Sequence, residues 1–245
     1  CTAVREGDHY VVNGEKTFIT SGMRADVYTV AVRTDPGAKG ARGISLLVIE
    51  RDAAGFTRTP LQKMGWWASD TAHLRIDDVR VPAGNLLGAE GEGFRAITHN
   101  FTAERFSMAA LALGFAWACC GEALEWARQR RTFGQRLVDH QVVRHRFVDM
   151  LAQIEATRAL LEDVAWRLDH EGSTDPGVVA AVCMAKNTAT RTMQFCADAA
   201  VQTLGGMGYM RGTKSERIYR EVKVNMIGGG AEEIMKDLAA RQLGL

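Results

Sequence analysis

The residues that could do chemistry gather in four short segments, which read RQRRTFGQR, QTLGGMGY, AER and IGGGAEE. The last segment has three consecutive glycines, Gly228, Gly229 and Gly230, then an alanine and two glutamates. Because glycine has no Cβ, such a loop lets a ligand approach the main chain, and a helix that follows offers N–H groups to an anion. A phosphate or a carbonyl oxygen would suit this place, but the pattern alone does not identify the ligand.

Several common kinds of site are not predicted. No GxGxxG or GxxxxGK motif follows a strand pattern, no GxSxG elbow is present, and the six histidines lack zinc-ligand spacing. Thirty basic and twenty-nine acidic residues give a net charge of +1 without a basic stripe, so nucleic acid is not an expected partner. The five cysteines contain no CxxC and are interpreted as core thiols in a reducing compartment.

The predicted secondary structure that carries these segments changes from strands to helices near residue 90. Before it, short β-rich runs are bounded by Gly, Pro or Asp, and Asn13-Gly14 predicts a hairpin turn. After it, apolar residues at helical period predict helices over about 93–130, 138–170, 177–204, 213–224 and 231–242. We therefore expect an α+β multidomain protein, with a small antiparallel β-barrel or sandwich domain over 1–90 and an up-and-down four-helix bundle domain over 91–245.

Signals of membrane insertion and targeting are not found in the sequence. It has no run of eighteen apolar residues, no signal-like beginning and no initiator methionine. We therefore expect no membrane span, a chain that is a fragment of a longer protein, and a cytoplasmic location in a bacterium.

Six blocks in a fixed order carry a resemblance to a known family. They are NGEKTFITSG, KMGWWASDTAHLRIDDVRVPAGNLLG, ERFSMAALALGFA, RRTFGQRLVDHQ, QTLGGMGYMR and YREVKVNMIGGGAEEIMKDLAAR. From about Ala3 to Leu243 the chain resembles the acyl-CoA dehydrogenase family, in which a middle β domain precedes a C-terminal helical bundle. The resemblance implies FAD as cofactor, fatty-acid β-oxidation, electron transfer to an electron-transfer flavoprotein, and a homotetramer built as a dimer of dimers. The family's N-terminal helical domain would be absent from this chain.

The resemblance also assigns FAD contacts to residues of both domains. In FITS, Phe18 and Ile19 fall where an aromatic side chain packs on the flavin, and Thr20 falls where a hydroxyl bonds near its N5; an ordinary strand is the alternative. A second set matches residues that reach the FAD of a neighbouring subunit, and consists of Arg130, Arg131, Thr132, Phe133, His140, Gln141, Gln202, Thr203, Leu204, Gly205 and Gly206. A basic helix end that satisfies the helix dipole is the alternative for the arginines.

Family chemistry needs a carboxylate that removes the pro-R α-proton of an acyl-CoA thioester while the β-hydrogen leaves as hydride to flavin N5, giving a trans-2-enoyl-CoA. That carboxylate must lie in a dry pocket that raises its pKa. In most members it is a Glu in the C-terminal loop, followed by Gly and Thr. The alignment places Gly229, Gly230 and Ala231 at these three positions, so the usual base is missing.

Some branches of the family, among them the long-chain and isovaleryl types, carry the base on the first long helix of the C-terminal domain, directly before an arginine. Glu104 and Arg105 match that position, and the apolar residues of the same helix turn, Phe106, Ala109, Ala110 and Leu113, are expected to bury it. We predict that Glu104 is the catalytic base and that Ala103, Arg105, Gly229 and Gly230 bind the substrate. A structural Glu104 paired with Arg105 or with a neighbouring helix is the alternative, and Glu232 and Glu233 are less favoured because acidic residues are ordinary in a first helical turn.

Other readings of the site stay open. A sister flavoenzyme, such as a nitroalkane oxidase or a dehydrogenase of carrier-bound or steroid-like substrates, would be expected to show an Asp as base or to consume O2. A non-catalytic flavin-binding scaffold would not depend on Glu104. Trp67 and Ala231 depart from the residues that many relatives carry, an arginine and a threonine, and the sequence does not predict the length of the acyl chain.

Overall fold

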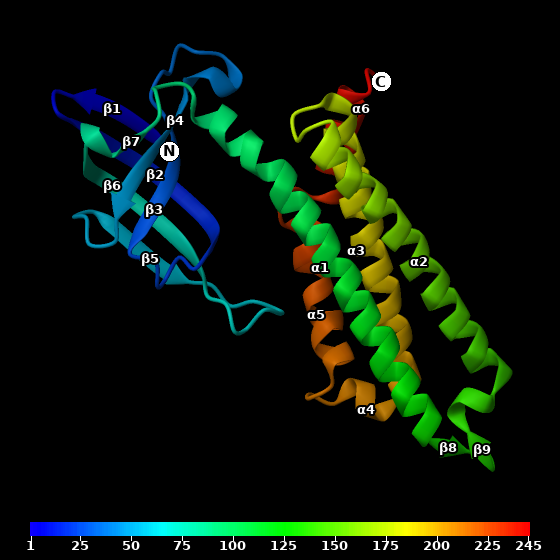
Figure 1. Cartoon of the computed structure of the whole chain (residues 1–245). Coiled ribbons are helices and arrows are strands. Elements are labelled where there is room, and N and C mark those ends of the chain that lie inside the picture. Colours follow the sequence, from blue (N-terminus) through cyan, green and yellow to red (C-terminus); the bar gives the residue numbers. More distant parts are fainter. The chain divides into compact units, whose positions relative to one another are not determined.

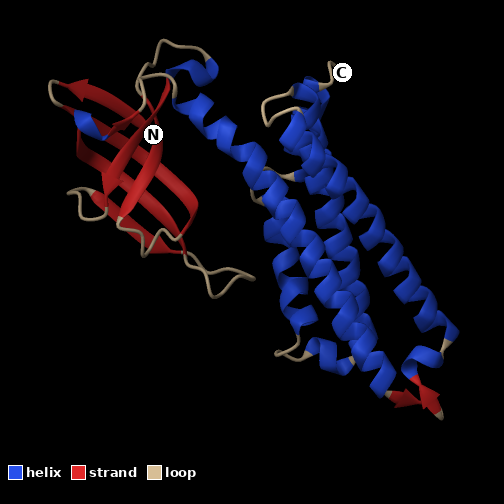
Figure 2. Cartoon of the chain, in the orientation of Figure 1, coloured by secondary structure: helices blue, strands red, loops and turns tan.

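The computed structural model describes all residues from 1 to 245 and divides the chain into two compact units, Cys1–Thr98 and His99–Leu245 (Figure 1). The first unit is mostly strand and the second is mostly helix (Figure 2). The predicted α+β fold, with a sheet followed by a helical part, is therefore confirmed.

The first unit is built on one seven-stranded sheet, in the order β5-β6-β2-β1-β3-β4-β7. All neighbours pair antiparallel except β1 and β3, which meet in parallel at Thr2 and Arg33. Alternate residues of the strands, such as Tyr10 with Val12 and Val30 with Val32, point into one apolar core. The strands are β1 (Thr2–Glu6), β2 (His9–Thr20), β3 (Val27–Arg33), β4 (Ile44–Glu50), β5 (Phe56–Pro60), β6 (Thr71–Pro82) and β7 (Leu86–Leu87).

The predicted hairpin turn at Asn13-Gly14 is wrong. Strand β2 continues through both residues, and the turn lies earlier, between Glu6 and His9, where β1 and β2 pair. At Gly14 the register with β6 shifts, and a Cβ there would lie 2.7 Å from the Cα of Cys1. The Asn13 side chain accepts from the N–H of Asp78 at 2.9 Å. This Asn-Gly pair therefore makes a bulge and a close strand approach, which favour the same residue types as a turn.

The second unit is a bundle in which long helices run up and down beside one another (Figure 1). The predicted helices agree with the observed ones to within about three residues at each end. The short helix α4, inside a stretch read as a loop, was not predicted. The helices are α1 (Gly93–Gln129), which begins in the first unit, α2 (Gln141–His170), α3 (Pro176–Leu204), α4 (Gly206–Tyr209), α5 (Lys214–Ile227) and α6 (Glu232–Gln242).

Small side chains form much of the bundle core. Helix α1 contributes Ala109, Ala112 and Ala116, and α3 contributes Ala185 and Ala189, all fully buried. Such residues let the helices approach closely and pack at high density. Helix α1 is long and apolar enough to cross a membrane by length and composition alone, a test that the core helix of a bundle also meets.

Local sequence signals account for the helix ends. Helix α3 starts at Pro176, after Asp175, whose side chain accepts from the N–H of Val178 at 3.0 Å, and it ends before Gly205, which has a φ of 62°. Between α1 and α2 lie the two-stranded hairpin β8 (Arg131–Thr132) and β9 (Gln135–Arg136) and a turn of 3₁₀ helix over Leu137–Asp139.

Candidate active site

Glu104 lies on α1 with its side chain exposed, and its carboxylate accepts a hydrogen bond from Asn100 Nδ2 at 2.9 Å. No ion pair joins it to Arg105, so the structural pairing considered for this dipeptide is not found. The apolar residues expected to bury this turn do so only in part, because Ala109 is buried whereas Ala110 is exposed. In this chain the Glu104 carboxylate is therefore open to solvent.

Arg105 connects α1 to the triple-glycine loop that joins α5 to α6. Its Nε donates to the carbonyl oxygen of Gly229 at 2.8 Å, and its guanidinium lies 5.0 Å from the centre of the Phe101 ring. The two segments that are 124 residues apart in the sequence are thus held together. Every residue predicted to handle the substrate lies in one of them.

Gly229 and Gly230 have backbone angles and neighbours that only glycine fits without displacing another side chain. Gly229 has a φ of 66°, in the left-handed region that side chains rarely adopt. A Cβ built on Gly229 would lie 2.8 Å from Sδ of Met108, which projects from α1. Gly230 has a φ of 119°, and a Cβ there would meet the methyl group of Met235. A side chain at either position would have to displace a methionine.

A lysine that the sequence analysis did not single out holds the same loop from inside the bundle. Lys186, on α3, is fully buried, and its Nζ donates to the carbonyl oxygens of Gly230 at 2.5 Å and Met226 at 3.5 Å. No carboxylate pairs with it. Burial, and then the nearby charge of Arg105, lower the pKa of Lys186 to about 8. Its only signal in the sequence is a single lysine in the middle of an alanine-rich helix.

Glu232, the first residue of α6, forms ion pairs with two cationic side chains. Its carboxylate is paired with Arg191 of α3 and, at 2.8 Å, with Lys236. The hydrogen bond from Arg191, followed by that from Lys236, lowers the pKa of Glu232 to about 2. A carboxylate held in this way is a weak base. Glu233 is exposed.

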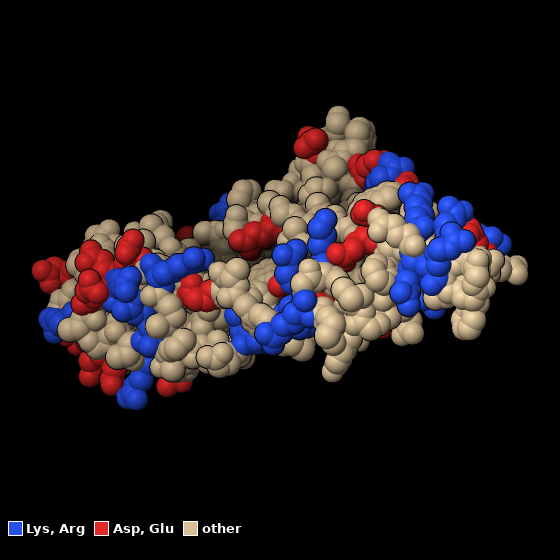
Figure 3. Space-filling model, turned by 90° about the horizontal axis from the view of Figure 1, so that it is seen from below, with Lys and Arg blue, Asp and Glu red and all other residues tan.

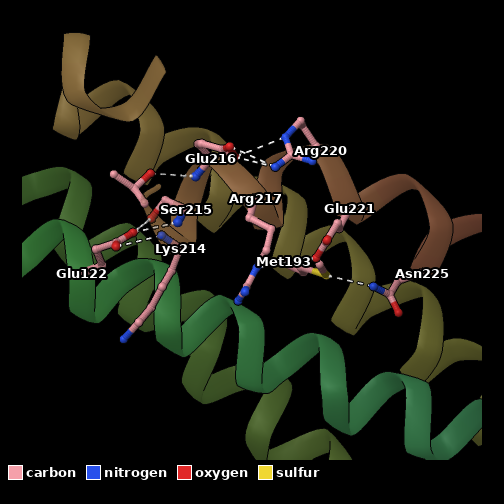
Figure 4. A network of polar contacts seen from close by, with 10 residues as sticks. Glu122, Met193, Lys214, Ser215, Glu216, Arg217, Arg220, Glu221 and Asn225 are labelled. Atoms are coloured by element: carbon pink, nitrogen blue, oxygen red, sulfur yellow. Dashed lines mark hydrogen bonds and ion pairs between the residues drawn. The ribbon is translucent and has the colours of Figure 1, made fainter. Parts of the chain in front are cut away.

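The helix that carries the loop, α5, is fixed to α1 at its other end (Figure 4). The Glu122 carboxylate accepts from the backbone N–H groups of Lys214 and Ser215, at 2.9 and 2.7 Å, and from Ser215 Oγ at 2.6 Å. Partial burial raises the pKa of Glu122, but the hydrogen bonds from Ser215 and Lys214 outweigh it, so the net pKa is lowered. An ionised Glu122 therefore caps α5 and faces the positive end of its dipole.

In the first unit, Phe18 stands out at the end of β2. Its φ is 61°, its side chain is 77% exposed, and the register with β6 shifts between Lys16 and Ile19. A bulky aromatic residue in the left-handed region is a backbone outlier, and such outliers cluster at functional sites. Ile19 packs against the core of this unit, whereas Thr20 is exposed. The three residues thus lie in strand β2, whose pairing with β6 is interrupted at Phe18 and resumes at Ile19 and Thr20.

A second exposed aromatic residue lies at the tip of the β8–β9 hairpin. Phe133 has a φ of 50° and is 97% exposed, and Gly134 after it has a φ of 82°. The His140 ring is held between Thr132 Oγ1 at 3.2 Å and Gln135 Nε2 at 3.0 Å. Basic side chains gather at this end of the helical unit (Figure 3), where the exposed arginines are Arg128, Arg130, Arg131 and Arg136.

The remaining predicted cofactor residues lie at the same end of the bundle as the hairpin (Figure 1). Thr203 and Leu204 are buried, and Thr203 Oγ1 donates to the Ala199 carbonyl at 2.7 Å and accepts from Arg146 at 3.1 Å. Their side chains belong to the packing, so only their main chain could meet a ligand. The other members of this set, Gln141, Gln202, Gly205 and Gly206, are exposed.

Two groups of predicted residues are thus far apart within the helical unit. Glu104 lies 25 residues before the end of α1 at Gln129, which corresponds to ~38 Å along a helix. The hairpin follows that end directly. The loop of glycines and the Glu104 turn form one group, and the hairpin with residues 202–206 forms another.

Comparison with known proteins identifies both units. Residues 1–79 match the model of the acyl-CoA dehydrogenase middle domain, and residues 91–244 match that of the acyl-CoA dehydrogenase C-terminal domain. An acyl-CoA dehydrogenase from Geobacillus kaustophilus has a similar structure, with a TM-score of 0.94 and 42% identity over all of this chain and 64% of its own.

The names of two relatives state their substrates. Cyclohexane-1-carbonyl-CoA dehydrogenase of Geobacter metallireducens is 37% identical over 99% of this chain and 62% of its own length. The mitochondrial isobutyryl-CoA dehydrogenase of Dictyostelium discoideum is 35% identical over 98% of this chain and 57% of its own. The chain thus spans about 60% of the length of these relatives.

Proposed function

The chain belongs to the acyl-CoA dehydrogenase family, and from this premise we propose that the protein desaturates an acyl-CoA thioester between its α and β carbons, giving a trans-2-enoyl-CoA. One observation carries the proposal: the glycine loop and the Glu104 turn are hydrogen-bonded to each other, and the loop position of the usual base is filled by Met108 of α1. A side chain is therefore excluded from this loop position, and the chain carries a carboxylate on the residue directly before Arg105.

We assign the α-proton abstraction to Glu104. Its carboxylate is bound only by a neutral amide, that of Asn100, and so keeps a lone pair for a proton. Glu232, the nearest alternative in sequence to the loop, is neutralised by two cations. Because Glu104 is exposed in this chain, the bound acyl group must displace water from its carboxylate.

The loop supplies the second requirement, polarisation of the thioester carbonyl. The carbonyl groups of Gly229 and Gly230 accept from Arg105 and Lys186, whereas the N–H groups of Gly229 and Ala231 make no hydrogen bond within the protein. Unpaired main-chain N–H groups of this kind stabilise a developing oxyanion. Stabilising that charge lowers the free energy of the enolate-like transition state.

The exposed residues fit FAD, which supplies the acceptor for the β-hydride when it is bound. Phe18 offers a free aromatic face, and Thr20 beside it offers a hydroxyl group. Arg130 and Arg131 are exposed guanidinium groups that can pair with a pyrophosphate, and Phe133 projects beyond them. Phe18 and Phe133 each combine a positive φ with a largely exposed aromatic ring, which supports a ligand role for both.

The separation of the two groups within the bundle supports an oligomer. Because ~38 Å of α1 separates Glu104 from the hairpin, the residues near the hairpin are proposed to bind the FAD of a neighbouring copy. A dimer of dimers is the arrangement that the family resemblance implies. An electron-transfer flavoprotein is the proposed electron acceptor.

The curated relatives suggest where to look for the substrate. The names of the two relatives above contain isobutyryl and cyclohexane-1-carbonyl groups, both branched at the α carbon. We therefore propose acyl-CoA thioesters as the substrate class and place short α-branched acyl groups first in the test.

The test is anaerobic reduction of the protein-bound flavin, followed near ~450 nm, with a panel of straight and α-branched acyl-CoAs. Reduction by at least one acyl-CoA, with formation of the matching enoyl-CoA, is expected. Absence of reduction by the whole panel, in protein that has retained FAD, would refute the proposal and leave a flavin-binding scaffold or another substrate class.

A further inference from the structure

We propose that Lys186 is a positioning residue of this site, which together with Arg105 holds the carbonyl side of the Gly229–Gly230 loop so that its N–H groups face the thioester oxygen. The inference rests on the proposed function for its catalytic consequence. Its structural part, the clamping of the loop, stands on the contacts alone. Lys186 would touch neither substrate nor cofactor.

The first argument is the cost of burying this lysine. Its side chain is fully buried on α3, no carboxylate pairs with it, and its only acceptors are the carbonyl oxygens of Gly230 and Met226. An unpaired buried ammonium group is expensive, and most lysines avoid this state by reaching solvent. A methionine would fill the same volume at lower cost. The charge therefore needs a reason other than the packing of α3.

Peptide geometry supplies the connection to the N–H groups. In a trans peptide the C=O and the following N–H point in opposite directions. When Arg105 holds the Gly229 oxygen, the N–H of Gly230 points away from Arg105, and when Lys186 holds the Gly230 oxygen, the N–H of Ala231 points away from the bundle core. Two cations on one side of the loop thus fix the direction of donors on the other side. Glycines with φ of 66° and 119° would otherwise leave these peptides free to rotate.

Electrostatics adds a second effect. Helix α5 ends at Ile227, directly before the loop, so the negative end of its dipole lies next to the loop. Lys186 contacts the Met226 carbonyl in the last turn of α5, and so offsets this negative potential. Without that charge, the helix end would oppose the charge that the loop is proposed to stabilise.

The experiment compares Lys186→Met with Lys223→Met in the whole protein with FAD bound. Lys223 lies on the exposed side of α5, so its replacement is the same chemical change on the helix that carries the loop, without loss of a carbonyl contact. Three readouts are taken, and one of them is the steady-state kinetics with acyl-CoA. Amide hydrogen exchange of residues 228–232 measures how firmly the loop is held. The infrared C=O stretch of a bound, ¹³C-labelled enoyl-CoA measures how strongly its carbonyl is polarised.

We expect the loop amides to exchange about tenfold to a hundredfold faster in Lys186→Met than in wild type, because a charge-assisted hydrogen bond is lost. The labelled C=O stretch should move toward its value in water, and kcat should fall at least about tenfold with little change in acyl-CoA affinity. Lys223→Met should match wild type in each readout. Lys186→Arg, which keeps the cation, should recover slow exchange, and it serves as the test if Lys186→Met does not fold.

The outcomes separate the two proposals. Unchanged loop exchange in Lys186→Met, or an equal increase in Lys223→Met, would overturn the clamp whatever the enzyme does. Faster exchange with an unchanged C=O stretch and kcat would reduce Lys186 to a purely structural lysine and overturn its role in the site. Faster exchange in a protein whose wild type is not reduced by any acyl-CoA would support the clamp while refuting the proposed function.

Discussion

Packing between Gly229 and Met108 should make this glycine much harder to replace than an ordinary left-handed glycine. In Gly229→Ala the φ of 66° costs ~1–2 kcal/mol, since a Cβ disfavours that region. The new Cβ would lie 2.8 Å from Met108 Sδ, and moving that side chain in a packed turn adds ~1–3 kcal/mol. We therefore expect the free energy of unfolding to fall by ~2–5 kcal/mol.

A double-mutant cycle separates the two causes. Gly172→Ala is the matched control, because Gly172 also has a positive φ, 93°, but nothing lies within 4 Å of an added Cβ, so only the backbone penalty should appear. In the background of Met108→Ala, the cost of Gly229→Ala should fall to that of the control, with a coupling energy of ~1–3 kcal/mol. Urea unfolding followed by far-ultraviolet circular dichroism provides the values. Equal costs at both glycines, with no coupling to Met108, would refute the idea that α1 excludes a side chain from the loop.

Three further predictions follow from the ionisable groups. The pKa of Lys186 is lowered from 10.5 to about 8, so between these pH values the unfolded chain binds more protons than the folded chain. The free energy of unfolding should therefore rise by on the order of 3 kcal/mol as the pH rises across this window. Unfolding experiments at several pH values should show no such rise in Lys186→Met. Glu122→Gln should lower the free energy of unfolding by ~1.5–3 kcal/mol at neutral pH, because it weakens the hydrogen bonds that cap α5 at Ser215. The pKa of Glu122 is lowered below 4.5, so the difference in stability between wild type and variant should vanish as the pH falls through that pKa. Glu232→Gln should leave the rate of flavin reduction within about a factor of two, because its carboxylate already serves Arg191.

Each of these has an outcome that contradicts it. A pH-independent difference between wild type and Lys186→Met from pH 8 to 10.5 would show that the lysine does not titrate in this window. A Glu122→Gln protein as stable as wild type would mean that the cap contributes nothing to the anchoring of α5. A large loss of activity in Glu232→Gln, at unchanged stability, would return Glu232 to the list of candidate bases.

The sequence predicted most of the helical unit because its signals are local. Helix α3 begins with Asp175-Pro176 and ends before Gly205, and each of these residue types has a specific role at a helix end. The same local logic failed at Asn13-Gly14, since a bulge and a turn both favour residues that tolerate unusual backbone angles. Only the position of β6 and of Cys1 decides between them.

The site could be predicted only as a set of separate pieces. The residues of the Glu104 turn and of the loop were identified from the family resemblance, but their hydrogen bond through Arg105 depends on how α1 and α5 pack. Lys186 was missed because a lone lysine in a helix is usually solvated, and nothing local marks it as buried. The left-handed backbone of Phe18 was equally hidden, because it arises from a register shift between two strands.

The most direct test of the central claim, that Glu104 is the base, compares anaerobic flavin reduction by the preferred acyl-CoA in wild type and in Glu104→Gln. The variant keeps an amide of the same shape and can still interact with Asn100, so folding and FAD content should be unchanged. The account predicts a loss of about a thousandfold or more in the reduction rate, together with loss of exchange of the substrate α-proton with solvent. A variant that reduces its flavin at the wild-type rate would contradict it.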